Sequence, residues 1–281
     1  EVFSAYFRAV RAIMDGSDEP WETRRPRIAD ALDHLLSGPF VAEPGIAVRP
    51  LSADHFTADQ ERELRDNFVS ESLSDEQIIT VDEPRAEEMS REIENALSLI
   101  RDHAPGTFAE FECCIGEIVP VAGRNSAEGL EFGGCSSLER WGSILINLDA
   151  QPGVVGLCES LVHEGAHNVL FGTSPVEFHL RNSPDERQVS PLRIDPRPLD
   201  GIYHATFVLA RMCYAMREFA SSPSLDEEMR ENAQGRADDA LRLFWDGHAV
   251  LEKPADYTDA GRAIMAAARD YMAGLETAVS A

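Results

Sequence analysis

The sequence has few positive charges and no long apolar run. Its formal net charge is −25, with 50 acidic residues against 25 lysines and arginines, and this balance opposes binding to a nucleic-acid backbone. Lys253 is the single lysine, which leaves almost no room for lysine-based covalent chemistry, and an anion site must rely on arginine. No apolar stretch reaches the ~18 residues of a membrane span, and no signal-peptide pattern is present. We therefore expect a cytoplasmic protein that binds neither nucleic acid nor membrane.

Cysteine is also scarce, and its spacing matches neither a disulfide framework nor a zinc site. The five cysteines form no C-x-x-C pair and their number is odd. We expect reduced thiols in the core of a cytoplasmic protein. Cys113 and Cys114 are adjacent, and on a strand they would point to opposite faces.

The hydrophobic pattern predicts an α+β fold that is mostly helical, with a small β-sheet next to one central helix. Residues 84–103 open with proline and are followed by a Pro-Gly pair, which is typical of a helix and its limits. Residues 111–123 and 142–148 have the composition of strands. A helix should follow over about residues 152–170.

The C-terminal half is predicted to be a helical bundle. A long loop over residues 173–195 precedes a helix that begins at Pro198 and is apolar on almost every side, so it should be buried. Two more helices follow, one opened by a capping box at Ser224–Glu227 and the other by Thr258. We expect one compact unit with three parts: an N-terminal helical region (1–83), a catalytic core (84–221) and a C-terminal helical hairpin (222–281).

One motif has the spacing of a metal site. Residues 161–172 read LVHEGAHNVLFG and contain His163, Glu164 and His167 as H-E-x-x-H. On a helix the two histidines lie about 40° apart and one turn along, so both imidazoles can contact one ion. Glu164 lies at the edge of the same face, where it can reach a metal-bound water or support a ligand. The usual interpretation of this spacing is zinc and peptide hydrolysis.

An open catalytic metal site generally has three protein ligands. The metzincin pattern would place the third ligand at Thr173, which is not a histidine, and the acidic downstream helix of other zinc peptidases is absent. His179 in the loop is a weaker candidate than His204, which lies in an apolar helix where a buried imidazole needs a partner. We predict that His163, His167 and His204 are the metal ligands, a set that suits zinc or iron.

Three arginines near His204 predict a carboxylate site. Arg193 and Arg197 precede it within a dozen residues, and Arg211 follows seven residues later on nearly the same helical face. A guanidinium can bind a carboxylate through two hydrogen bonds. Alternatively, each arginine forms a salt bridge with a neighbour such as Asp200. A peptidase does not generally need such a group, whereas an oxygenase with a dicarboxylate co-substrate does.

Together these stretches resemble a known family. The motif helix, the segment SPLRIDPRPLDGIYHATFVLARM (190–212) and the upstream CSSLERWGSILINL (135–148) resemble the HExxH-type peptide β-hydroxylases that depend on α-ketoglutarate. These enzymes act in the biosynthesis of ribosomally made, modified peptides. The resemblance covers residues 93–216, and its most specific string is R-P-L-x-G-x-x-H, which ends at His204. Leu192 stands where relatives are expected to carry an aromatic residue, which predicts a different pocket there.

The resemblance implies an Fe(II) dioxygenase that uses O₂ and α-ketoglutarate on a precursor peptide. The three histidines would hold the iron, and an arginine would bind the far carboxylate of the co-substrate, with Arg197 ahead of Arg193 and Arg211. The ketoacid would lose CO₂ and become succinate while one oxygen atom enters the β-carbon of a peptide residue. Glu164 would then orient a ligand or a bound water.

Two other functions compete with this hypothesis. The first is a zinc metallopeptidase, in which Glu164 is the general base that activates the metal-bound water. However, the sequence contains no third-ligand pattern that is known for that class. The second is a peptide-binding partner protein whose metal is structural or lost, which the intact spacing of the histidines disfavours.

Overall fold

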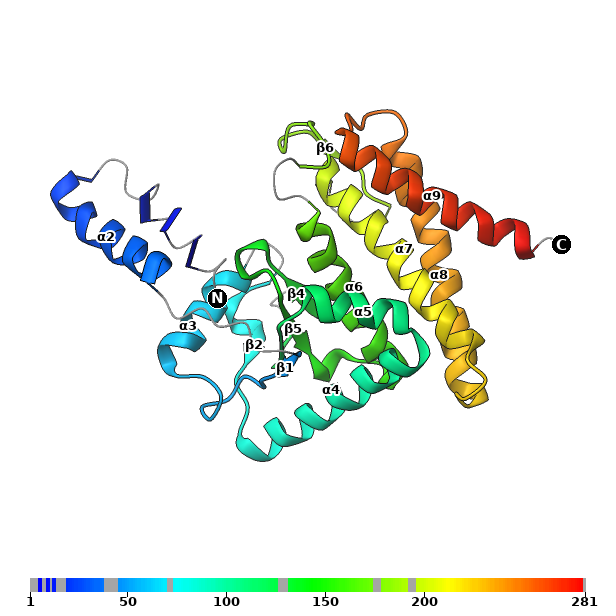
Figure 1. The fold of residues 1–281 in the computed structure, drawn as a ribbon, viewed down its shortest axis with the longest axis horizontal. Helices are drawn as coiled ribbons and strands as arrows, with labels where there is room; N and C mark the ends of the chain where they lie inside the picture. Colours follow the sequence, from blue (N-terminus) through cyan, green and yellow to red (C-terminus); the bar gives the residue numbers. More distant parts are fainter. Residues whose placement is uncertain are drawn as a thin grey trace. The chain divides into compact units, whose positions relative to one another are not determined.

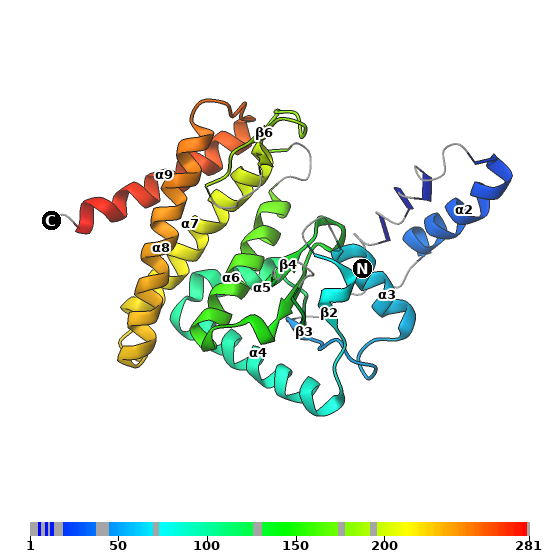
Figure 2. The ribbon, with the colours of Figure 1, turned by 180° about the vertical axis from the view of Figure 1, so that it is seen from behind.

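The computed structural model describes residues 5–6, 9–10, 12–13, 19–37, 45–69, 73–125, 131–173, 178–191 and 196–279. Over these residues the chain forms eight α-helices, a five-stranded sheet and a two-stranded sheet (Figures 1 and 2). This confirms the predicted α+β, mostly helical class.

The chain divides into two compact units. The first contains Glu1–Ser90 and Ile115–Ala150, and the second contains Arg91–Cys114 and Gln151–Ala281. This division differs from the three consecutive parts predicted from the sequence. The chain leaves the first unit along a helix, returns to it through three strands and then leaves it again. Strand pairing joins segments that are distant in sequence, so a local pattern does not reveal such a path.

The sheet of the first unit is built around β3 (Glu117–Gly123). Its neighbours are β1 (Ala47–Val48) and β5 (Ser143–Asn147) in parallel and β2 (Ile78–Ile79) antiparallel, while β4 (Gly134–Ser136) pairs antiparallel with β5. Every residue of β5 is buried. A strand buried on both faces needs a continuous apolar run, and residues 144–146 of this strand supply one.

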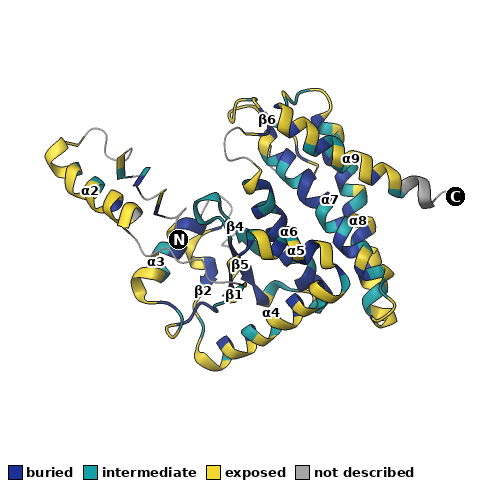
Figure 3. Cartoon of the chain, in the orientation of Figure 1, coloured by how far each residue is buried: buried dark blue, intermediate teal, exposed yellow. Residues whose placement is uncertain are grey.

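The core of the first unit joins this sheet to α3 (Ala58–Phe68). Leu64 and Phe68 of the helix form one buried cluster with Val119 and Val121 of β3 and Leu145 of β5. Figure 3 shows the buried strands and the exposed outer faces of the helices. The helix begins with a capping box between Thr57 and Gln60, which satisfies backbone N–H groups that its first turn leaves unbonded.

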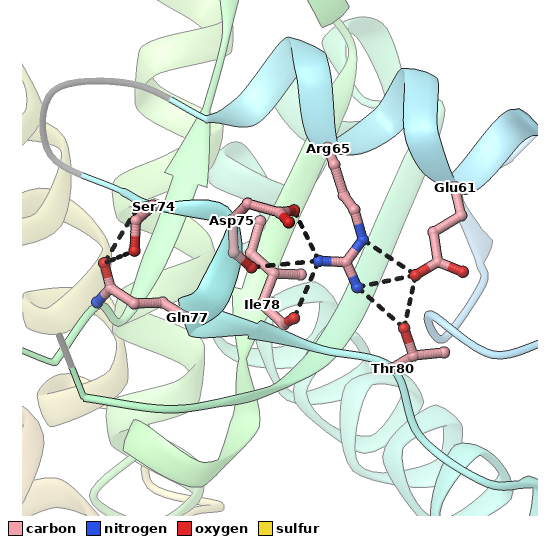
Figure 4. Close-up of polar contacts among 7 residues, drawn as sticks. All are labelled: Glu61, Arg65, Ser74, Asp75, Gln77, Ile78 and Thr80. Atoms are coloured by element: carbon pink, nitrogen blue, oxygen red, sulfur yellow. Dashed lines mark hydrogen bonds and ion pairs between the residues drawn. The ribbon is translucent and has the colours of Figure 1, made fainter. Parts of the chain in front are cut away.

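A hydrogen-bonded arginine ties α3 to the segment around β2 (Figure 4). The Arg65 guanidinium contacts the carboxylate of Glu61 at 2.8 Å, the carboxylate of Asp75 at 3.0 Å and the Ile78 carbonyl at 3.0 Å, and it donates to Thr80 Oγ1 at 3.0 Å. Guanidinium donors in a fixed fork favour such multiple contacts. All these partners belong to the first unit, and the cluster holds that unit together.

The second unit is a helical bundle. Its main helices are α5 (Pro105–Cys114), α6 (Gly153–Gly172), α7 (Leu199–Ser221), α8 (Glu227–Leu251) and α9 (Asp259–Val279). Helices α7 and α8 run side by side in both views (Figures 1 and 2). Tyr203 and Phe207 of α7, Leu170 of α6, Phe244 of α8 and Met265 of α9 share one buried core.

Several predicted elements are confirmed. Helix α4 (Glu83–His103) and α6 match the predicted helices to within a few residues, and α7 has Pro198 as its N-cap. Thr258 precedes α9 and its hydroxyl accepts a hydrogen bond from Gly261 N at 3.1 Å, so the predicted start of this helix is also confirmed. α2 (Trp21–Ser37) ends where a Gly-Pro pair follows in the sequence.

Two local predictions are wrong. Residues 111–114, predicted as strand, are the last turn of α5, and β3 begins only at Glu117. Phe111 is buried, so packing within the second unit overrides the strand propensity of this segment. The N-cap of α8 is Asp226, which accepts from Met229 N at 2.8 Å, and not the predicted Ser224.

All five cysteines are free thiols, as predicted. Burial raises the pKa of Cys158 to about 12 and that of Cys213 to about 11. Cys113 and Cys114 lie at the end of a helix, so the predicted strand is wrong for both. Only Cys158 and Cys213 are buried in the core; Cys114 and Cys135 are half-buried and Cys113 is exposed. Among the described helices, none has both the length and the apolar character needed to cross a membrane.

Candidate histidine site

The H-E-x-x-H motif lies on α6, most of whose residues are buried. Gly165, between the two motif histidines, permits close contact with α5: a Cβ atom at this position would lie 2.3 Å from Phe111 Cε1. The small residue is therefore needed for packing. It places one face of the motif against α5, and the histidines occupy another part of the helix surface.

The three predicted ligand histidines lie in a row of ring contacts within the second unit. The ring centroids of His163 and His167 on α6 are 5.1 Å apart, and those of His167 and His204 on α7 are 5.9 Å apart. The interplanar angle of the second pair is 26°. Packing of α6 on α7 thus brings together two motifs that are far apart in the sequence.

A phenyl ring closes one side of the row. The Phe171 centroid lies 6.3 Å from that of His167 and 5.9 Å from that of His204. The His163 side chain is 41% exposed, whereas that of His204 is only 20% exposed. The site is therefore open to solvent at its His163 end and shielded at its other end.

Burial controls the charge of the inner histidines. Removal from water lowers the pKa of His167 well below its usual value, and the neighbouring His163 and His204 lower it further. Burial also lowers the pKa of His204, against an opposing contribution from Asp200. Both imidazoles are therefore neutral at neutral pH and carry a lone pair, which is the form that ligates a metal.

Each end of the row has a carboxylate nearby. Asp200 Oδ2 lies 3.7 Å from His204 Nε2, one turn away on α7. Glu164 is buried, and its Oε1 lies 3.9 Å from His163 Nε2. Both separations exceed hydrogen-bond distance, so each carboxylate acts on its ring through its charge. A carboxylate that hydrogen-bonds to the second N–H of a ligating histidine would also fix the tautomer and orientation of the ring. Asp200 is not among the predicted site residues, although its spacing four residues before His204 on one helix indicates this contact.

His179, the weaker third-ligand candidate, also lies beside the site. Its ring centroid is 6.2 Å from that of His204 and 5.0 Å from that of Tyr203, on which it stacks. It is 1% exposed, although it belongs to a segment predicted as loop. Burial lowers the pKa of His179, and His204 lowers it further.

The donor chemistry of the site suits a transition metal. The residues are imidazoles, two of them half-buried and neutral, with a carboxylate near each end of the row. As placed, however, no group of three or more His, Cys, Asp or Glu side chains among the described residues could hold a metal ion. The imidazoles are adjacent, with ring centroids 5.1 and 5.9 Å apart, but they do not converge on one ion.

The three arginines have different environments. Arg193 lies outside the described residues. Arg197 forms part of β7 (Arg197–Pro198), directly before α7, and its Nε atom is buried. Arg211 pairs with the carboxylate of Glu110 on α5, and its guanidinium lies 5.4 Å from the ring of Tyr214.

No protein-family model matches this chain, and no curated protein matches it at a significant level.

Proposed function

We propose that this protein is an Fe(II)- and α-ketoglutarate-dependent oxygenase that hydroxylates the β-carbon of a residue in a ribosomally made precursor peptide. The observation that carries the proposal is the row of ring contacts joining His163 and His167 to His204. These residues belong to the two strings, H-E-x-x-H and R-P-L-x-G-x-x-H, on which the family resemblance rests. Their contact supports a common metal site.

Each residue of the row has a role in this proposal. The three histidines would hold the iron, and bound Fe(II) supplies the site at which O₂ and the ketoacid react. Asp200 would orient the His204 ring through its 3.7 Å contact. Phe171 shields the inner side of the site from water, because its ring lies against both His167 and His204.

The co-substrate needs a cation for its far carboxylate. Arg197 is the first candidate, and Arg193 and Arg211 are the alternatives. A guanidinium binds a carboxylate through two parallel hydrogen bonds and keeps its charge at any physiological pH. The peptide substrate would then approach from the exposed His163 end of the site, where the shielding is least.

Glu164 separates this proposal from the zinc peptidase. In a peptidase it would accept a proton from the metal-bound water. In the oxygenase it would hold the His163 ring, from which its carboxylate is 3.9 Å away. Replacement by glutamine keeps its size and its hydrogen-bonding capacity but removes the base. We therefore expect Glu164→Gln to retain Fe(II) binding and succinate formation.

The test is an anaerobic titration of the metal-free protein with Fe(II) and then α-ketoglutarate. We expect a weak visible charge-transfer band, which is lost in His167→Ala and retained in His34→Ala, a change of an exposed histidine. On admission of O₂, succinate should form, and a substrate peptide should gain the mass of one oxygen atom. The absence of the band, together with tight zinc binding and peptide cleavage abolished by Glu164→Gln, would establish the peptidase instead.

A further inference from the structure

The backbone around His179 is bonded to the segment that begins α9. Its carbonyl oxygen accepts hydrogen bonds from Thr258 N at 3.0 Å and Thr258 Oγ1 at 3.2 Å, at the start of α9. The next residue, Leu180, forms an isolated β-bridge with Tyr257. Gly261 makes this approach feasible, because a Cβ atom there would lie 2.1 Å from the His179 carbonyl oxygen. The backbone of His179 is therefore fixed to α9.

The side chain is fixed as well. Its ring stacks on Tyr203 with centroids 5.0 Å apart and an interplanar angle of 16°. Tyr203 is itself fully buried and donates its hydroxyl hydrogen to the carbonyl of Gly261 at 3.0 Å. The His179 ring also lies edge-on to His204, with centroids 6.2 Å apart and an interplanar angle of 65°. The imidazole thus contacts both a buried aromatic ring and a predicted metal ligand, which are neighbours on α7.

The tautomer of His179 follows from its partner. Thr173 Oγ1 donates its single hydrogen to the Leu170 carbonyl at 2.7 Å, and it lies 3.0 Å from His179 Nε2. A carbonyl only accepts, so the hydroxyl oxygen must accept from the ring. Nε2 therefore carries the hydrogen, and Nδ1 of the neutral ring carries the lone pair. Thr173 ends α6, so this bond ties the ring to the helix that holds His163 and His167.

We propose that His179 is a positioning residue of the histidine site. The His179 ring is bonded to the end of α6 and contacts α7, and it holds the His204 ring where His163 and His167 can share a cation with it. This inference rests on the proposed metal site. A merely structural His179 would serve only to anchor the loop, and the ring would be replaceable by any side chain that keeps the bond to Thr173. A positioning ring would not be replaceable in this way.

Two substitutions separate these roles. His179→Gln can keep an N–H donor near the Nε2 position but has no ring, and Thr173→Val keeps the size of the threonine but removes the acceptor of the Nε2 hydrogen. Thr173→Ser is the matched control, because it retains the hydroxyl. The probe is Co(II) alone, added to the full metal-free chain, with the affinity and the visible d–d spectrum as readouts and thermal unfolding of the metal-free protein as the check on folding.

We expect His179→Gln and Thr173→Val to weaken Co(II) binding about 10- to 100-fold, as loss of supporting groups around metal ligands generally does, and to change the d–d spectrum. Thr173→Ser should keep the Co(II) affinity and the d–d spectrum of the unaltered protein. If both variants bind Co(II) with the affinity and spectrum of the unaltered protein, the inference is wrong. If His179→Gln does not fold, Thr173→Val and Thr173→Ser decide the matter by themselves. If the unaltered protein binds neither Co(II) nor Fe(II), the metal site fails, and with it the proposed function.

Discussion

Replacing Asp200 by asparagine should weaken metal binding without unfolding the protein. The carboxylate lies on α7 one turn before His204, with Oδ2 at 3.7 Å from Nε2. It stabilises positive charge on that ring, and when the ring ligates a cation it stabilises the charge that the imidazole shares with the metal. Asparagine keeps the shape of the side chain but not its charge.

The size of the effect follows from the distance and the exposure. At this separation two unit charges attract by about 1 kcal/mol in water and by about 4.5 kcal/mol at an effective dielectric constant of about 20. The Asp200 side chain is 51% exposed, so solvent screening places the value near the lower limit, at about 1–2 kcal/mol. That corresponds to a loss of roughly 5- to 30-fold in affinity.

The measurement is competition for Co(II) or anaerobic Fe(II) against a chelator of known affinity, with Asp246→Asn as control. Asp246 is also half exposed, at 49%, and pairs with Arg242 on α8. Asp246→Asn therefore removes one negative charge from a side chain that is about as exposed as that of Asp200. Asp200→Asn should lose affinity and Asp246→Asn should not. Equal affinities for the two variants would show that Asp200 does not act on His204 and would remove it from the site.

Three further predictions concern acid stability, packing and the co-substrate. Burial lowers the pKa of His167 and His204, the two inner histidines, below the unfolded value of about 6.5, so the unfolded chain binds more protons than the folded chain below that pH. The metal-free protein should therefore lose unfolding free energy as the pH falls below about 6.5, and thermal unfolding at pH 7.5 and 5.5 measures this. Gly261→Ala places a Cβ atom 2.1 Å from the backbone of His179 and should cost about 1–3 kcal/mol in chemical denaturation, whereas Gly274→Ala, with open space around it, should not destabilise α9. Arg197→Gln should raise the dissociation constant for α-ketoglutarate about 10- to 100-fold with Fe(II) binding intact, and Arg211→Gln should lower stability instead; the opposite result would exchange their roles.

Helices with local end signals were predictable from the sequence. Pro84 at the start of α4 and Pro198 before α7 mark helix starts through the fixed backbone angle of proline, and Thr258 signals α9 through its side-chain oxygen. Residues 111–114 lack such a signal. Their apolar, aromatic composition fits a strand, and only the packing of Phe111 against Gly165 shows why they are helical.

The candidate site was predictable where it depends on one helix. The spacing of His163 and His167 places their rings on one face of α6, and the observed 5.1 Å separation follows directly from that periodicity. Contact with His204 depends on how α6 packs on α7, which no local pattern indicates. The prediction that His204 joins the site rests instead on the chemistry of a buried imidazole and on the family resemblance. The contact of His179 with Thr173 depends on a loop, whose path the sequence leaves undetermined.

The choice among the arginines depends on what each guanidinium already contacts. Arg211 is paired with Glu110, so a carboxylate bound there would only replace one ion pair by another, and the net gain would be small. Arg197 directly precedes Pro198, the N-cap of α7. The N–H groups of the first helical turn and the helix dipole both favour an anion at such a position. Asp200, which faces His204, lies in the same turn and would repel a carboxylate that approached from its side. If the protein uses the proposed co-substrate, its far carboxylate is therefore expected at the Arg197 end of α7, on the side away from Asp200.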